Sequence, residues 1–370
     1  MEPLALKYRP RTFDDLVGQR AAQVVLRQMV TTRTIPPAIL LDGPRGTGKT
    51  TTARILAAAV NCDATPVPCG QCPSCKSVYD GSSLDVIEID AASNGLVDDI
   101  RALRSQVMYR TAGRYRIVAL DEAQGISRAG FNALLKTFEE PPLDTVFILL
   151  TTERGKIPDT ILSRCMPFSF HRIPVADIAA RLAHIAAAEG FTVTPEVLAH
   201  IAERADGGMR DAIMVLDQIS RVDITTLTEF AELFGDIDAG PTLAAAVMTG
   251  NHATVHTVLT GHLQRGADPT TAADSLAATL RDLLVLRTGG VLHWQGISLT
   301  QRRTLADRAD TATLVGALKI LWDLRTKVRP GDNARVSLDL AMTMTTELFA
   351  SRTTPPAPGR LTLDQMKDGQ

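Results

Sequence analysis

"GPRGTGKT" occupies residues 43–50 and is the stretch that decides the fold. It matches the pattern G-x-x-x-x-G-K-[ST], with an apolar run before it and a helical pattern after it. Glycines let successive backbone N–H groups point inward around phosphate oxygens, and the helix that follows directs its own N–H groups at the same anion. The alternative is a glycine-rich turn without a ligand. The strand before it and the helix after it favour a phosphate-binding loop.

Each residue of this loop has an expected role toward ATP and Mg²⁺. Lys49 should hold the β and γ phosphates, and the hydroxyl of Thr50 should coordinate Mg²⁺. The predicted cofactor-binding residues of the loop are Gly43, Pro44, Arg45, Gly46, Thr47, Gly48, Lys49, Thr50 and Thr51.

Two acids, Asp121 and Glu122, end the apolar run at residues 117–120. A strand here would bring Asp121 to the Mg²⁺ and Glu122 to an attacking water, which are the two tasks of acids in nucleotide hydrolysis. Alone, such a run is weak evidence, because strands often end in Asp. Together with the phosphate loop it predicts a hydrolytic site.

Apolar runs with β-branched residues alternate with helical patterns through the first half of the chain. The runs span residues 38–42, 85–90, 116–121 and 146–151, and the helical patterns span 50–60, 97–108 and 127–139. This alternation predicts an α/β fold, with a parallel sheet covered by helices on both faces. Ligands of such sheets bind beyond the carboxyl ends of the strands.

The sequence changes character after Pro174. Leu, Ile, Val and Ala stand at helical spacing in residues 175–190, 194–205 and 209–220, and the pattern stays helical to about residue 350. The last residues hold three prolines and little apolar pattern. We expect an α/β core over 1–173, helical regions over 174–235 and 236–350, and a disordered tail over 351–370.

The composition indicates a soluble protein. Hydrophobic residues make up 45% and charged residues 22% of the 370 residues, and the net charge is −2. The N-terminus lacks the apolar segment of a secretory signal, and no apolar run reaches the ~18 residues of a membrane-spanning helix. We therefore expect a cytoplasmic protein without a membrane partner. Any DNA contact must come from local charge.

Four of the five cysteines follow the spacing C-x6-C-x2-C-x2-C, and they are Cys62, Cys69, Cys72 and Cys75. Thiolates so spaced on tight turns can supply the four tetrahedral ligands of zinc. Four protein ligands leave the metal no open position, so we expect a structural site. Disulfides and free thiols are the alternatives, and a reducing cytoplasm disfavours disulfides. The fifth, Cys165, is expected to be a small buried apolar residue.

The chain resembles the AAA+ ATPases and, within them, the gamma/tau clamp-loader subunits of bacterial DNA polymerase III. The similar motifs occur in the family's order across about the first 220 residues. They are KYRP at 7–10, LVGQ at 16–19, the phosphate loop, the four cysteines, IDAAS at 89–93, FNALLKTFEEPP at 131–142, TT at 151–152, ILSRC at 161–165 and MRDA at 209–212. The four-cysteine insert is the most specific of these. The helical regions are similar to the family's lid (174–235) and, more weakly, its collar (236–350).

The resemblance implies further site residues. Tyr8, Arg9 and Val17 would border the adenine. Thr152 would be the first sensor, a polar group beside the γ phosphate, with Thr151 as its close rival.

Two arginines also receive roles from the resemblance. Arg210, in the lid, would be the second sensor and touch the phosphates from the other side. Arg164, in the Ser-Arg-Cys motif, would reach the nucleotide of a neighbouring subunit. The alternative for both is an exposed arginine in a surface ion pair, which is common and weak.

Some positions depart from the family pattern. Gln124 stands where many relatives have His, and Asn94 stands where relatives often have a basic residue near DNA. Arginines give this region local positive charge, although a solvated helix face explains most of them equally well. They are Arg101, Arg104, Arg110, Arg114 and Arg116.

The resemblance implies an ATP-hydrolysing motor subunit of a clamp loader, which opens a sliding clamp and places it on primed DNA during replication. Its partners would be subunits of the delta and delta-prime type, further copies of itself in a ring-like oligomer, the sliding clamp and primer-template DNA. The length is similar to the shorter gamma form.

One alternative is an AAA+ ATPase that remodels DNA directly, in branch migration or initiation; the cysteine insert and the Ser-Arg-Cys motif argue against it. Another is a non-hydrolysing scaffold, against which Lys49, Thr50, Asp121 and Glu122 argue.

Overall fold

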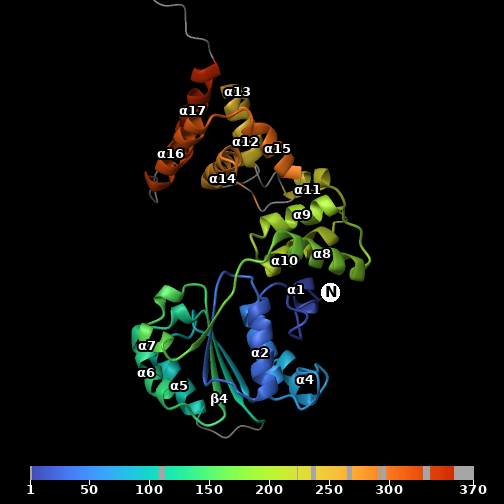
Figure 1. The fold of residues 1–370 in the computed structure, drawn as a ribbon, viewed down its shortest axis with the longest axis vertical. Helices are drawn as coiled ribbons and strands as arrows, with labels where there is room; N and C mark the ends of the chain where they lie inside the picture. Colours follow the sequence, from blue (N-terminus) through green and yellow to red (C-terminus); the bar gives the residue numbers. More distant parts are fainter. Residues whose placement is uncertain are drawn as a thin grey trace, which may run out of the picture. The chain divides into compact units, whose positions relative to one another are not determined.

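The computed structural model describes residues 2–107, 113–222, 224–234, 239–264, 269–290, 292, 297–327 and 334–353. The chain divides into two compact units, Met1–Ile224 and Thr225–Gln370 (Figure 1). The predicted core (1–173) falls within the first unit, whereas the first predicted helical region (174–235) extends past the end of that unit at Ile224. The finer division into core, lid and collar stays a prediction.

The first unit combines a sheet with helices. Its strands are β1 (Ala38–Asp42), β2 (Val86–Asp90), β3 (Arg116–Asp121), β4 (Thr145–Thr151) and β5 (Met166–Ser169). Its helices are α1 (Leu4–Lys7), α2 (Arg20–Thr32), α3 (Lys49–Val60), α4 (Pro73–Tyr79), α5 (Val97–Val107), α6 (Arg128–Glu139), α7 (Asp159–Leu162), α8 (Val175–Glu189), α9 (Pro195–Arg204) and α10 (Met209–Ser220), with the 3₁₀ turns η1 (Ala123–Gly125) and η2 (Arg154–Lys156).

The five strands form one sheet in the order β2-β3-β4-β1-β5, and every neighbouring pair is parallel. The α/β prediction is confirmed, and the four predicted strands agree with the structure to within a residue. None of the predicted strands corresponds to β5. This strand is short, contains Pro167 and is mostly exposed, and proline is tolerated at a sheet edge because a donor is not needed there.

Helices cover both faces of the sheet, with α2 on one face and α5 and α6 on the other (Figure 1). Successive residues of β1 alternate between the two faces. Ile39 and Leu41 pack in a cluster with residues of α2 and α3, whereas Leu40 packs in a cluster with residues of α5 and α6. Burial on both faces explains why the strands read as continuous apolar runs rather than alternating ones.

Helices α8, α9 and α10 fall where the helical spacing predicted them. Each buries one apolar face; Leu182 of α8 and Leu216 of α10 are fully buried. Helix α8 ends at Gly190, which has the left-handed conformation that commonly terminates helices.

The second unit is helical in all its described elements. They are α11 (Leu227–Phe234), α12 (Ala239–Met248), α13 (His252–Gln264), α14 (Pro269–Arg287), α15 (Ile297–Ala306), α16 (Thr311–Lys327) and α17 (Ala334–Thr353). Helix α17 continues past residue 350, where the tail was predicted to start; residues 354–370 of that tail lie outside the described residues. Among the described helices, none combines the length and apolarity needed to cross a membrane.

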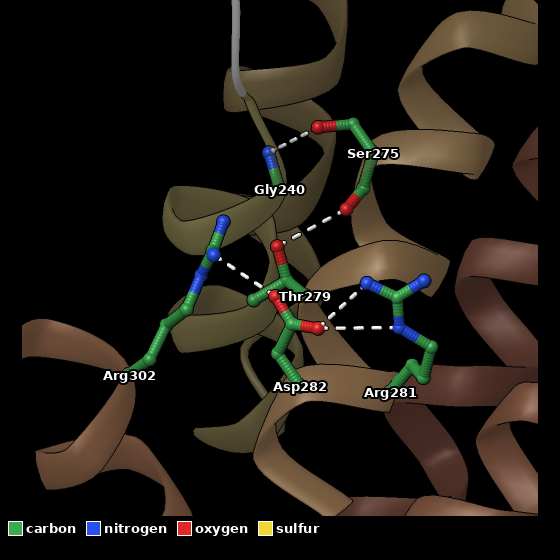
Figure 2. A network of polar contacts seen from close by, with 6 residues as sticks. All are labelled: Gly240, Ser275, Thr279, Arg281, Asp282 and Arg302. Atoms are coloured by element: carbon green, nitrogen blue, oxygen red, sulfur yellow. Dashed lines mark hydrogen bonds and ion pairs between the residues drawn. The ribbon is translucent and has the colours of Figure 1, made fainter. Parts of the chain in front are cut away.

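A buried ion pair joins two helices of this unit (Figure 2). Asp282 of α14 is 1% exposed and accepts a hydrogen bond from Nη1 of Arg302 in α15, itself 4% exposed, at 2.9 Å. The other carboxylate oxygen of Asp282 accepts from the exposed Arg281 at 2.8 Å. Nearby, Ser275 accepts from the N–H of Gly240 at 3.0 Å. Each carboxylate oxygen of Asp282 therefore accepts a hydrogen bond from one arginine, the buried Arg302 or the exposed Arg281.

Asp282→Ala is expected to lower the unfolding free energy of this unit by about 3–5 kcal/mol, because the mutation leaves the guanidinium of Arg302 buried without this carboxylate. Arg281→Ala is the matched control, since it removes an ion pair to the same carboxylate from an exposed side chain. That change should cost at most about 1 kcal/mol. Both tryptophans, Trp294 and Trp322, belong to this unit, so urea unfolding followed by tryptophan fluorescence reports on it. Equal losses in the two variants would contradict the expectation.

Candidate nucleotide and metal sites

The phosphate loop joins β1 to α3 in a conformation that requires glycine. Gly43, Gly46 and Gly48 have φ values of +143°, +76° and +101°, which side-chain-bearing residues rarely adopt. A Cβ atom on Gly43 would lie 2.2 Å from the carbonyl oxygen of Phe170, which follows β5. The first residue of the loop must therefore be glycine, because Phe170 leaves no room for a side chain there. Its backbone conformation suits an anion cradle.

Gly46 lies against the start of helix α10. A Cβ atom on Gly46 would meet the Cα of Gly208 at 2.9 Å, and a carboxylate oxygen of Asp211 lies 3.5 Å from the same point. The Gly207-Gly208 pair separates α9 from α10. Its contact with the loop depends on the fold, and no local pattern would reveal it.

Lys49 is buried within the loop. Its ammonium donates to the carbonyl oxygens of Gly43 at 2.7 Å and Pro44 at 2.8 Å. Burial lowers the pKa of Lys49, while the carboxylates of Glu122 and Asp121 act in the opposite direction. The loop therefore holds a cation that can exchange its bonds to these carbonyl groups for bonds to phosphate oxygens.

The predicted Mg²⁺ ligands lie next to each other. The hydroxyl of Thr50, in the first turn of α3, donates to Oδ2 of Asp121 at 2.8 Å. The other oxygen of Asp121 accepts from the N–H of Glu122 at 2.9 Å. Hydroxyl and carboxylate oxygens are the donors that Mg²⁺ prefers, so this pair fits the ion.

Glu122 follows β3 with a φ of +49°, which is unusual for a residue other than glycine. Sparsely populated backbone conformations of this kind cluster at functional sites. The two rival sensor residues differ in burial. Thr151, the last residue of β4, is fully buried, whereas Thr152 is half-buried. Thr152 is therefore the one that a bound nucleotide could reach.

Two of the residues expected to border the adenine, Tyr8 and Arg9, contact α8 and α3. The hydroxyl of Tyr8 donates to Glu189 at the end of α8, and Lys7 pairs with the same carboxylate at 2.7 Å. Hydrogen bonds from Lys7 and Tyr8 lower the pKa of Glu189. Arg9 donates to the hydroxyl of Thr51 at 3.3 Å. Val17 is half-buried; its neighbour Leu16 lies 3.8 Å from a Cβ placed on Gly48.

Arg210 and Arg164 occupy different surroundings. Arg210 is exposed in the first turn of α10. Burial lowers the pKa of Arg9, and the charges of Arg54 and, more weakly, Arg210 act in the same direction. The predicted contact of Arg210 with the phosphates stays a prediction. Arg164 is exposed and pairs with Glu139 at 2.8 Å, and it donates to the carbonyl oxygen of Thr160 at 2.6 Å. These partners belong to α6 and α7 rather than to the phosphate loop.

The four clustered cysteines form one group whose sulfur atoms all lie within 4.8 Å of one another. The sulfur atoms of Cys62 and Cys72 are 4.0 Å apart, close to the separation of about 3.8 Å that tetrahedral Zn–S bonds of about 2.3 Å imply. Backbone N–H groups, that of Gln71 foremost, lower the pKa of Cys69 to about 6. The cluster can hold one metal ion. None of the five cysteines forms a disulfide, and Cys165 is buried as expected.

Ion pairs partly neutralise the positive charge of the region around Asn94 and Arg101 that was considered for DNA contact. Asn94 donates to the carbonyl oxygen of Asp90 at 3.2 Å, which holds it in its own turn. Arg101 pairs with Asp98, and Arg114 with Asp63. Arg116 is buried, and Arg110 lies outside the described residues. The described geometry therefore assigns no DNA-contacting residue.

Two family models match parts of the first unit. Residues 18–174 match the family described as "DNA polymerase III, delta subunit", and residues 177–219 match "DNA polymerase III clamp loader subunit, ATPase lid domain". The chain is 38% identical over 347 residues to the DNA polymerase III subunit tau of Bacillus subtilis, covering 90% of this chain and 61% of that protein. It is 41% identical over 229 residues to the subunit gamma of Buchnera aphidicola, covering 61% of this chain and 62% of that protein.

The chain spans about three fifths of the length of these two relatives. Among solved structures, the Thermotoga maritima RuvB Holliday junction branch migration motor is similar at a TM-score of 0.48 and 18% identity. That match covers 65% of this chain and 79% of the other.

Proposed function

This chain belongs to the family of DNA polymerase III tau and gamma clamp-loader subunits, and we propose that it is an ATP-hydrolysing motor subunit of a clamp loader. The observation that carries the proposal is the 2.8 Å hydrogen bond between Thr50 and Asp121. It joins the phosphate loop to the end of β3, with Glu122 directly beside it. A glycine-rich turn without a ligand has no need for this pairing.

The residues of the site would divide the work of hydrolysis among them. Backbone N–H groups of the loop and the ammonium of Lys49 bind the phosphates. Thr50 and Asp121 would hold Mg²⁺, which supplies neutralisation of the phosphate charge. Glu122 orients the water and accepts its proton. Thr152 donates to the γ phosphate, and Arg210 reaches it from the lid.

Arg164 would act on the nucleotide of a neighbouring subunit. Its guanidinium is exposed at the surface of the first unit, and its partners there are an acid and a carbonyl group rather than its own phosphate loop. We propose a ring-like oligomer with further copies and with subunits of the delta and delta-prime type, assembled through the collar. Its targets would be the sliding clamp and primer-template DNA in the cytoplasm.

The cysteine cluster would hold one structural zinc ion. Four sulfur atoms within 4.8 Å of one another support zinc over an oxygen-preferring ion. The cluster belongs to the insert that follows α3 and is separate from the acids.

Lys49→Ala is expected to weaken ATP binding about 10- to 100-fold, because it removes a charged hydrogen-bond donor to the phosphates. Glu122→Gln should leave ATP affinity unchanged while lowering turnover about 10²- to 10⁴-fold, because the water loses its base. Fluorescent-nucleotide titration and phosphate release measure the two effects. Glu153→Gln is the control, since Glu153 is an exposed acid paired with Lys156 and should change neither quantity. Wild-type turnover in Glu122→Gln would rule out its role as the base.

Arg164→Ala should preserve the ATP affinity of isolated subunits and lower turnover of the assembly about 10³-fold or more, as expected for an arginine supplied in trans. Arg221→Ala is the control, because it removes a comparable exposed ion pair, to Asp217 at 3.1 Å. Mixing Arg164→Ala with Lys49→Ala subunits should restore turnover at junctions where an intact pocket meets an intact arginine. No recovery despite subunit exchange would show that Arg164 acts within its own subunit or only structurally.

Metal analysis of the purified, reduced protein should give about one zinc per chain. Cys75→Ser should lose this zinc on dialysis against a chelator, because a closed site then has three thiolates, whereas Cys165→Ser should retain it. Chelation should lower the melting temperature clearly, whereas it should lower ATP affinity only slightly. A zinc-free wild type that melts at the same temperature with and without chelator would contradict the assignment.

A further inference from the structure

The side chain of Gln124 lies at the junction between the ends of β3 and β4. It belongs to the 3₁₀ turn η1, which follows Glu122 directly and packs against β4. Its amide nitrogen donates to Oε2 of Glu122 at 2.6 Å and to the hydroxyl oxygen of Thr152 at 3.1 Å. Its amide oxygen accepts from the hydroxyl of Thr151 at 2.6 Å. One side chain thus contacts the expected base Glu122, the expected sensor Thr152 and the last residue of β4, Thr151.

The chemistry of the partners fixes the orientation of this amide. An ionised carboxylate only accepts hydrogen bonds, so the NH₂ group of Gln124 must face Glu122. The carbonyl oxygen then faces Thr151, whose hydroxyl can donate to it. The hydroxyl of Thr151 also accepts from the backbone N–H of Glu153 at 3.0 Å, so its position is fixed by the backbone beyond β4. Each hydrogen bond in this network therefore pairs one donor with one acceptor, from the N–H of Glu153 through Thr151 and Gln124 to Glu122 and Thr152.

Two consequences follow for the reactive groups. Gln124 occupies one oxygen of Glu122 and leaves the other for a water molecule. Thr152 accepts from Gln124, so its own hydroxyl proton stays available for a phosphate oxygen. The unusual backbone of Glu122, with φ at +49°, turns its side chain back toward this amide.

We propose that Gln124 is a positioning residue that holds Glu122 and Thr152 in one hydrogen-bonded unit, so that contact of Thr152 with the γ phosphate sets the orientation of the base. This inference rests on the proposed ATP hydrolysis. Gln124 does not touch the nucleotide and acts through its two partners. An amide suits the task because it offers a donor and an acceptor on one rigid plane without changing its charge with pH.

Gln124→Leu tests the inference, because leucine keeps similar bulk and removes both the donor and the acceptor. In the oligomer that the full chain forms, with its partner subunits where turnover requires them, kcat should fall about 10- to 100-fold. The KM for ATP and the affinity for a fluorescent ATP analogue should stay within about twofold. Gln124→Asn retains the amide and should recover part of the loss. Gln28→Leu is the matched control at an exposed position of α2 and should leave kcat unchanged.

A double-mutant cycle with Thr151→Val separates positioning from general damage. Thr151→Val removes the hydroxyl that donates to the amide oxygen of Gln124, so its effect on kcat should largely disappear when Gln124 is already leucine. Additive effects, or an unchanged kcat in Gln124→Leu beside an active wild type, would overturn the inference. So would equal losses of kcat and nucleotide affinity, which would indicate a structural role. An inactive wild-type assembly would instead contradict the proposed function itself.

Discussion

The order of three parallel strands determines where the reactive groups of this protein can meet. Strand β4 lies between β3 and β1, so the phosphate loop after β1, the acids after β3 and the threonines at the end of β4 share one edge of the sheet. Backbone hydrogen bonds continue the sheet past this edge: the N–H of Gly43 donates to the carbonyl oxygen of Thr151 at 3.1 Å. The sheet therefore fixes the positions of these groups relative to one another, and the proposed hydrolysis would require such preorganisation.

Close backbone contacts link this edge to its surroundings. Gly43 meets Phe170, and Gly46 meets Gly208 at the start of α10, at distances that leave no room for a side chain. Protein interiors are close-packed, so the loop cannot change shape without a response in the chain pressed against it. The first turn of α10, which carries Arg210, is thereby coupled to the loop that would hold the phosphates. A tightly packed lid can respond to the nucleotide in a way that a loosely tethered one cannot.

Much of this arrangement could be predicted from the sequence, because periodicity and motif spacing are local properties. The phosphate loop, four strands, the helices to residue 220 and the cysteine cluster all have local signals. The rest depends on partners far along the chain. Strand β5 is short, contains Pro167 and gains its place only by pairing with β1. The choice between Thr151 and Thr152 is of the same kind. Thr151 ends β4, which is buried along its whole length, and Thr152 follows outside the strand, so only the fold shows which of the two is buried. The role of Gln124 requires three such partners at once.

The cysteine cluster and the phosphate loop lie at opposite ends of helix α3. Cys62 and Cys75 are buried among residues of the end of α3, and the sulfur of Cys75 lies 3.8 Å from the carbonyl oxygen of Ala58. Lys49 begins the same helix. The rise of about 1.5 Å per residue therefore separates Lys49 from Val60 by about 16 Å. A metal held by these thiols is too distant to touch a phosphate at the loop. It can stabilise the end of α3 and the insert that follows, and through them the helix on which the loop depends.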